Sequence, residues 1–204
     1  MPTRGKPMQK LFVAVALGLA LPAAATAQTI SGTNHDLSAR GWGSTELCVF
    51  CHTPHNATTA VTAAPLWNHG VTAVASYGTY ASATLNATVG QPGDISKLCL
   101  SCHDGTVAID TYGTRTGTNF MTGGALVGTN LSNDHPVGFT YDATLATADG
   151  GLKDPTTPAT IAPARLFAGK MECASCHNAH SDQYGKFLRG SNAGSGLCLA
   201  CHSK

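Results

Sequence analysis

The sequence predicts a fold made mostly of loops, with short helices, little strand and a core formed by bound cofactors. The 204 residues include 23 Gly and 10 Pro, and segments 111–133 and 150–164 are rich in Gly, Thr, Asn and Pro, which is typical of irregular connections. Such a chain has too few apolar runs to offset its ordering entropy by burial alone. The second observation is a motif, C-x-x-C-H, whose four copies use all eight cysteines: Cys48–His52, Cys99–His103, Cys173–His177 and Cys198–His202.

The C-x-x-C-H motif is the attachment signature of haem c. Two thiols three positions apart lie on one side of a helical turn and can bond the two vinyl groups on one edge of a porphyrin, while the adjacent histidine ligates iron. A single C-x-x-C also suits zinc or a disulfide, but four copies, each followed by His, favour haem. We therefore expect four haem c groups whose stacked porphyrins form the core, and an apoprotein that is largely unfolded. The covalent attachment residues are Cys48, Cys51, Cys99, Cys102, Cys173, Cys176, Cys198 and Cys201, and the proximal iron ligands are His52, His103, His177 and His202.

Five further histidines remain as candidates for the second axial position of each iron: His35, His55, His69, His135 and His180. Because four irons need at most four of them, and the only methionines after residue 27 are Met121 and Met171, the sequence predicts bis-His ligation, with lower potentials than His/Met sites have. His55, His135 and His180 are expected ligands. Whether His35 or His69 is the remaining ligand stays open.

Two of these histidines follow a proximal histidine by three residues. His55 follows His52, and His180 follows His177. Residues three apart on a helical turn share a face, whereas two axial ligands approach an iron from opposite sides. His55 and His180 must therefore serve neighbouring haems, so each motif joins two cofactors.

Helix signals surround the motifs. Ser44 or Thr45 can cap a helix over Cys48–His52, Asp94 can cap one over 95–103 that ends at Gly105, and Ser195 can cap one over 198–202. A third short helix is expected over 173–177. Residues 28–204 are interpreted as one domain with haem pairs around 48–103 and 173–202, in which Trp67 and Tyr77 pack on porphyrin faces.

Residues 1–27 are predicted to be a signal peptide that is removed. Arg4, Lys6 and Lys10 precede an apolar stretch that ends near Leu21, and Ala25-Thr-Ala27 is an A-x-A cleavage site. Export to the extracellular space or cell surface is expected, with the periplasm as the alternative. No later run approaches the ~20 apolar residues of a membrane helix, so no integral membrane span is expected. Removal of residues 1–27 takes away three of the 12 basic residues, and the remaining nine with the 11 acidic residues give a mature charge of about −2. This charge provides no basic footprint for nucleic acid.

Taken in order, the motifs point to a family. His35-Asp-Leu-Ser, Cys48-Val-Phe-Cys-His-Thr-Pro-His-Asn, Asn133-Asp-His-Pro-Val-Gly and Cys173-Ala-Ser-Cys-His-Asn-Ala-His resemble the doubled-C-x-x-C-H multihaem cytochromes. More narrowly, they resemble the extracellular tetrahaem nanowire cytochromes of the OmcE type. The resemblance implies an electron carrier rather than an enzyme, with bis-His haems in stacked pairs.

The resemblance also implies subunits that polymerise into a conductive filament passing electrons to external acceptors, and a histidine of one subunit that can ligate a haem of the next. His55, His135 and His180 match the distal positions and His35 the N-terminal one, while His69 matches none. The expected partners are other copies of the chain, other redox proteins and extracellular electron acceptors. The alternatives are a monomeric periplasmic electron shuttle and a small-oxidant reductase. The reductase would need an open or Lys-ligated iron, and no C-x-x-C-K occurs.

Overall fold

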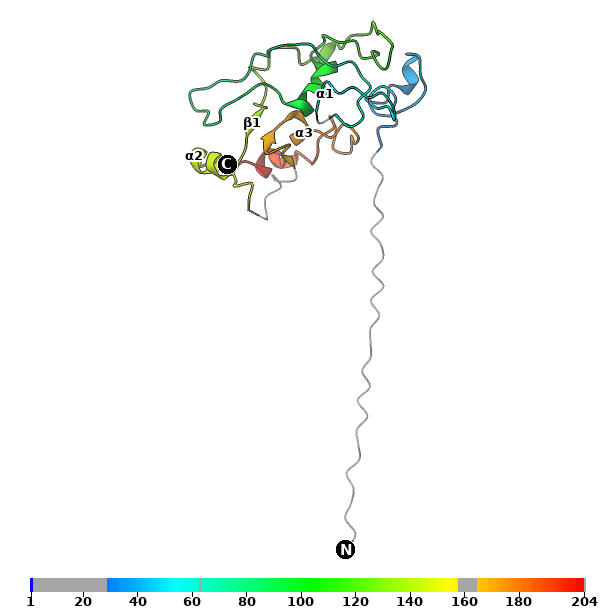
Figure 1. Ribbon diagram of the computed structural model, residues 1–204. Helices are drawn as coiled ribbons and strands as arrows, with labels where there is room; N and C mark the ends of the chain where they lie inside the picture. Colours follow the sequence, from blue (N-terminus) through cyan, green and yellow to red (C-terminus); the bar gives the residue numbers. More distant parts are fainter. Residues whose placement is uncertain (2–28, 63, 158–164, 204) are drawn as a thin grey trace.

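The computed structural model describes Met1 and residues 29–62, 64–157 and 165–203; apart from Met1, the predicted signal peptide lies outside these residues. The prediction of a loop-built chain with short helices and little strand is confirmed (Figure 1). Stacked haems as the core remain a prediction. The helices and strands are η1 (Ser38–Arg40), α1 (Asp94–His103), η2 (Gly123–Ala125), β1 (Phe139–Thr140), α2 (Ala143–Asp149), β2 (Lys170–Met171), α3 (Cys173–Cys176), η4 (Ala193–Ser195) and η5 (Cys198–Ala200).

Helix α1 carries the second motif and is the longest helix in the described residues. Its N-cap is Gly93 rather than Asp94, so the predicted cap is wrong. Gly93 has extended backbone angles and its N–H donates to Glu172 Oε2 over 3.1 Å. Asp94 is instead the first helical residue, where its charge complements the helix dipole. Gly105, with a φ of +77°, follows the C-cap in the left-handed region as predicted.

The first motif forms a single turn rather than the predicted helix. The N–H groups of Cys51 and His52 both donate to Cys48 O, over 3.2 and 2.8 Å. Pro54 lacks an N–H and disfavours helical angles at Thr53, so the turn cannot continue into a helix.

The last two motifs differ from each other. The short helix expected over 173–177 is confirmed as α3, whose N-cap Glu172 forms a capping box with Ser175. The fourth motif forms the 3₁₀-helix η5, whose N-cap is Leu197. The predicted cap, Ser195, belongs to the preceding η4 and has a φ of +61°, so its backbone turns away before the motif begins.

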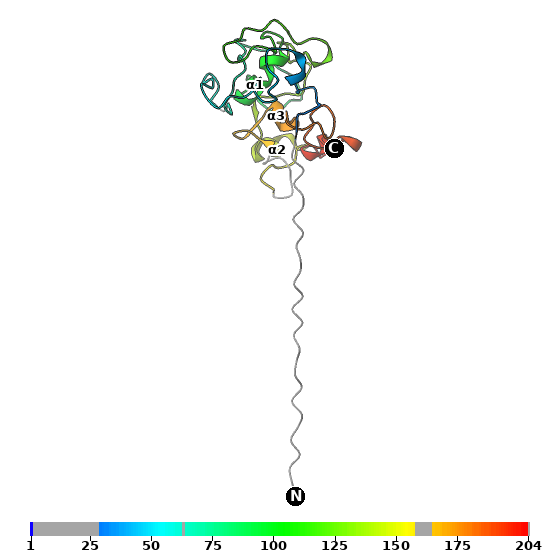
Figure 2. The same cartoon turned by 90° about the vertical axis from the view of Figure 1, so that its right-hand side faces the viewer.

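Glu172 joins the second and third motifs at the centre of the molecule. α1 and α3 lie side by side in both ribbon views (Figures 1 and 2). The Glu172 carboxylate is buried and accepts hydrogen bonds from Gly93 N and Ser96 Oγ, and Ser96 Oγ in turn accepts from Cys173 N over 2.9 Å. The two attachment motifs are thus held together by polar contacts.

Two small clusters of buried apolar side chains lie within the described part of the polypeptide. One surrounds the antiparallel pair β1–β2, where Phe139 lies opposite Met171. The other contains Tyr77, Leu100 and Leu131. Tyr77 is 4% exposed and its hydroxyl donates to Asp104 Oδ2 over 2.7 Å, so its predicted place on a porphyrin face is wrong: it lies inside the polypeptide core.

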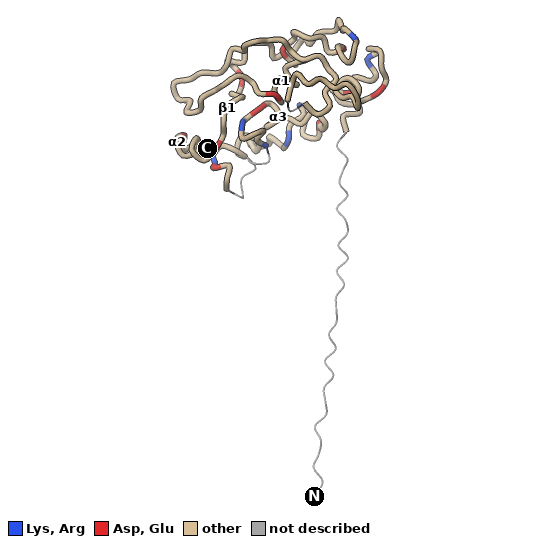
Figure 3. The backbone as a smooth tube through the Cα atoms, in the orientation of Figure 1, with Lys and Arg blue, Asp and Glu red and all other residues tan. Residues whose placement is uncertain are grey.

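Charged residues of both signs are spread thinly along the backbone (Figure 3). Among the described residues, no helix has the length and apolar character needed to cross a bilayer.

Candidate functional site

The proximal histidines of the first three motifs are oriented by backbone carbonyls. The Nδ1 atoms of His52, His103 and His177 lie 2.7, 2.7 and 2.9 Å from the carbonyl oxygens of Pro65, Ala125 and Lys186. Because a carbonyl can only accept, Nδ1 carries the proton and Nε2 keeps the lone pair that a metal needs. The sequence offered no signal for these acceptors, since any residue supplies a carbonyl.

Three proximal histidines face a second histidine from a distant segment. His52 faces His180 with ring centroids 6.0 Å apart and planes 16° apart. His103 faces His35 with ring centroids 6.2 Å apart and planes 68° apart.

The third pair is His202 and His135, with ring centroids 6.3 Å apart and planes 78° apart. Two imidazoles on opposite sides of one metal have centroids about 6 Å apart, since each metal–nitrogen bond is about 2 Å long and the nitrogen lies about 1 Å from the ring centre. The three pairs therefore fit an iron ligated by two histidines.

The distal histidine of two of these pairs is also oriented through Nδ1. His35 Nδ1 lies 3.1 Å from the carbonyl oxygen of Ala179, and its ring stacks on Phe187 with centroids 4.0 Å apart. His135 Nδ1 lies 2.9 Å from the carbonyl oxygen of Pro136. Burial lowers the pKa of both histidines, which favours the neutral imidazole that can ligate a metal.

His55 and His177 are the two expected ligands without such a partner. Both are exposed, and within the described residues no ring contact joins either of them to another histidine.

His69 is placed quite differently from the other four non-motif histidines. It is 3% exposed, its Nδ1 lies 2.6 Å from Gly70 O, and its Nε2 lies 3.1 Å from Ala108 O. Nε2 is also 3.4 Å from the sulfur of Cys102. Both ring nitrogens are therefore engaged by the protein, directly behind the second attachment motif.

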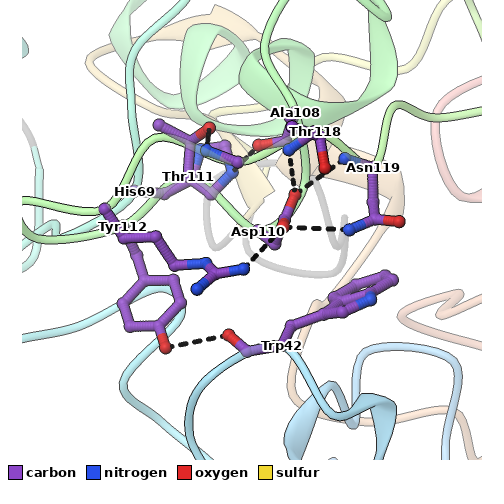
Figure 4. A network of polar contacts seen from close by, with 10 residues as sticks. Trp42, His69, Ala108, Asp110, Thr111, Tyr112, Thr118 and Asn119 are labelled. Atoms are coloured by element: carbon purple, nitrogen blue, oxygen red, sulfur yellow. Dashed lines mark hydrogen bonds and ion pairs between the residues drawn. The ribbon is translucent and has the colours of Figure 1, made fainter.

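The loop that follows Ala108, which contacts His69 through its carbonyl, carries a network of polar contacts (Figure 4). Its centre is Asp110, which is fully buried and accepts from the N–H groups of Thr118 and Asn119 over 3.0 and 2.9 Å, from Asn119 Nδ2 over 2.9 Å and from Arg115 over 3.3 Å. Burial opposes ionisation, but the hydrogen bonds from Asn119 and Arg115 outweigh it and lower the pKa of Asp110 to about 2. This buried carboxylate was not among the residues predicted from the sequence.

The attachment cysteines of successive motifs are neighbours. No disulfide joins any two of the eight. Burial, with smaller contributions from Cys51 and Asp104, raises the pKa of Cys102 to about 12.

The Cys173 side chain raises the pKa of Cys99, and the Cys99 side chain lowers the pKa of Cys173, so these two cysteines lie close together. Burial, followed by the nearby thiol of Cys201, raises the pKa of Cys176. The first motif thus adjoins the second, the second adjoins the third, and the third adjoins the fourth.

Trp67 carries a buried polar atom that a cofactor could satisfy. In the described part of the chain its indole Nε1 is the one buried side-chain nitrogen or oxygen without a hydrogen-bond partner. The indole stands perpendicular to His52, with ring centroids 6.1 Å apart. An unpaired buried N–H costs about 1–3 kcal/mol, and a haem carboxylate is an acceptor suited to it, so this atom also fits haem at the first motif.

A family comparison agrees with this chemistry. Residues 166–204, which contain the third and fourth motifs, match the family model of the doubled CXXCH motif. No curated protein matches the chain. The doubled motif indicates covalent haem c and supports assignment of the chain to the multihaem c-type cytochromes.

Proposed function

We propose that the protein transfers electrons through four covalently bound haem c groups, each ligated by two histidines. The observation that carries the proposal is the set of three facing imidazole pairs at centroid distances of 6.0–6.3 Å. The assigned pairs are His52 with His180, His103 with His35, and His202 with His135. His55, which follows the first motif, is assigned to the iron of His177 in the third. Since His180, which follows the third motif, already faces His52 in the first, the first and third motifs would exchange their second histidines.

The arrangement suits relay rather than catalysis at iron. Bound haem supplies a one-electron ferric/ferrous couple. The paired histidines would hold each haem iron through two imidazoles, and an iron held in this way would leave no site for a small oxidant. The neighbouring attachment cysteines keep the four sites in one continuous series.

We further propose that the chain is a subunit of an extracellular conductive filament that receives electrons from other redox proteins and passes them to external acceptors. The resemblance of its motif order to the OmcE type supports this assembly. Cys48 and Cys198, at the two ends of the series, are exposed, as is Leu199 beside the latter. The first and last haem sites are therefore open to a neighbouring copy.

A monomeric periplasmic shuttle is the second candidate. The observation that favours it is the pairing of His35 with His103 inside one chain, because all four irons can then be completed without a histidine from a second copy.

Native protein purified from its producing cells tests these proposals. Intact mass and haem absorbance should give four haems per chain, all low-spin; fewer haems, or a high-spin iron in the unmodified protein, contradicts the proposed relay. Electron microscopy of the same preparation separates the two assemblies. Ordered fibres support the filament, whereas monodisperse particles at high concentration exclude it and leave the shuttle.

A further inference from the structure

The four motifs share one local contact whose donor differs between them. The residue after the first cysteine of each motif offers its carbonyl oxygen to a hydrogen bond. In the first motif Val49 O accepts from the neutral amide of Asn68 over 2.5 Å. In the second, Leu100 O accepts from the backbone N–H of Asp104 over 2.8 Å.

In the last two motifs the donor at this position is a cation. Ala174 O in the third motif accepts from the guanidinium Nε of Arg189 over 2.5 Å. Leu199 O in the fourth motif accepts from the ammonium Nζ of Lys153 over 2.5 Å. Two neutral donors therefore hold the N-terminal motifs and two positive charges hold the C-terminal ones.

Both cations are held at more than one point. The backbone N–H of Arg189 donates to Cys176 O over 2.8 Å, and its guanidinium lies 5.9 Å from the centre of the Phe167 ring. The backbone N–H of Lys153 donates to Cys201 O over 2.7 Å. Arg189 and Lys153 are both half-buried, and a partly buried charge is screened less than an exposed one.

Acidic side chains lie beside both halves of the series: Asp104 directly follows the second motif, and Asp149 and Asp154 act on Tyr141, which donates to Cys201 O in the fourth. Asp104, directly after the second motif, is 4% exposed. Its carboxylate accepts hydrogen bonds from the hydroxyls of Thr72, Tyr77 and Thr106. Asp110 is paired with Arg115, and Glu172 lies between the second and third motifs and acts on both.

The distribution of charge along the chain has the same direction. Residues 28–133 contain three Lys and Arg against five Asp and Glu, whereas residues 134–204 contain six of each.

We propose that the anchored charges of Arg189 and Lys153 make the haem sites of the third and fourth motifs easier to reduce than those of the first and second, so that electrons inside one chain collect at the C-terminal pair. This inference rests on the proposed function. In each transfer the iron that gives up the electron becomes ferric and the receiving iron becomes ferrous. A nearby positive charge favours the ferrous form, which carries one positive charge fewer.

The expected size follows from Coulomb's law. A unit charge about 10 Å from an iron, at an effective dielectric constant of about 20, changes the reduction equilibrium about tenfold. For a one-electron couple a tenfold change corresponds to about 59 mV.

Redox titration of the full holoprotein, followed optically and by electron paramagnetic resonance, tests the inference. Arg189→Gln and Lys153→Met should each weaken reduction of one of the more easily reduced haems about tenfold. Arg189→Lys and Lys153→Arg keep the charge and should restore the wild-type titration. Lys170→Gln removes an exposed cation that, among the described residues, donates to no carbonyl of a motif, and it is the matched control for net charge.

The first motif provides an internal reference. Its histidine planes are 16° apart, whereas the other two facing pairs are at 68° and 78°, and low-spin haems with near-parallel and near-perpendicular ligand planes give different resonance signals. The near-parallel signal should titrate among the haems that are hardest to reduce and stay in place in Arg189→Gln.

Unchanged titrations in both charge-removing variants, or reduction of the first-motif haem before the others, would overturn the inference. Failure of the proposed function would be visible separately, as a haem content below four or as high-spin iron in the wild-type protein.

Discussion

Removal of His180 should open one iron and leave the other three intact. His180 faces His52 with ring centroids 6.0 Å apart and planes only 16° apart, and alanine has no group that can reach the metal from that side. His52 keeps its hydrogen bond to Pro65 O at 2.7 Å, so the proximal ligand stays oriented. One iron in four should therefore lose an axial ligand.

The expected magnitude is a high-spin signal equal to a quarter of the total haem in His180→Ala. Carbon monoxide should bind the reduced variant with a stoichiometry of one per chain, and added imidazole should restore the low-spin spectrum. The near-parallel resonance signal is the one that should disappear.

His69→Gln is the matched control, because His69 is also a non-motif histidine but has both ring nitrogens engaged by Gly70, Ala108 and Cys102. It should keep four low-spin haems. A fully low-spin His180→Ala, or an equal high-spin fraction in His69→Gln, refutes the ligand assignment.

Three further outcomes follow from buried polar groups. Asp110→Asn places an amide N–H₂ against the donors of Asn119 and Arg115, so chemical denaturation of the holoprotein at neutral pH should show a free energy of unfolding lower by about 2 kcal/mol. Because the pKa of Asp110 in the folded protein is about 2 against an ordinary value of 3.8, the stabilisation is present above pH 3.8 and is lost as the pH falls towards 2. The difference between wild type and variant should therefore shrink in acid, and a constant difference would contradict the assigned cause. Trp67→Phe keeps an aromatic ring but removes the unpaired Nε1–H; vibrational spectra should show a change in one haem carboxylate, and Trp42→Phe should show none. Glu172→Gln should lower the holoprotein's free energy of unfolding by about 1–3 kcal/mol, because this buried carboxylate accepts from the first residues of α1; an unfolding midpoint equal to that of wild type would show that the contact between the second and third motifs is not held by Glu172.

Several local predictions were wrong for a common reason. Asp94 and Ser195 are good N-cap residues by type, yet the caps at these helices are Gly93 and Leu197. The backbone before α1 is held by the hydrogen bond from Gly93 N to Glu172, and the backbone before η5 is turned by the left-handed Ser195. These constraints outweigh an N-cap preference worth about 1 kcal/mol.

Helix α2 shows the opposite case, in which local signals were present but overlooked. Asp142 Oδ1 accepts from Leu145 N over 2.8 Å, and Gly150, with a φ of +67°, ends the helix. An Asp and a Gly that bracket seven residues are a usable helix signature.

The sequence by itself determined which side chains each C-x-x-C-H motif brings together, because two thiols and an imidazole within five consecutive residues need only one local turn to lie close to one another. It also determined the loop-built character of the chain, since Gly, Pro and Thr leave few residues for regular helices or strands.

Only the tertiary structure decided which distant histidine faces the first, second and fourth motifs. It also decided why His69 is engaged by protein while His35 faces His103, and which motifs receive a cation. These contacts join residues far apart along irregular loops, where no periodicity relates sequence position to direction in space.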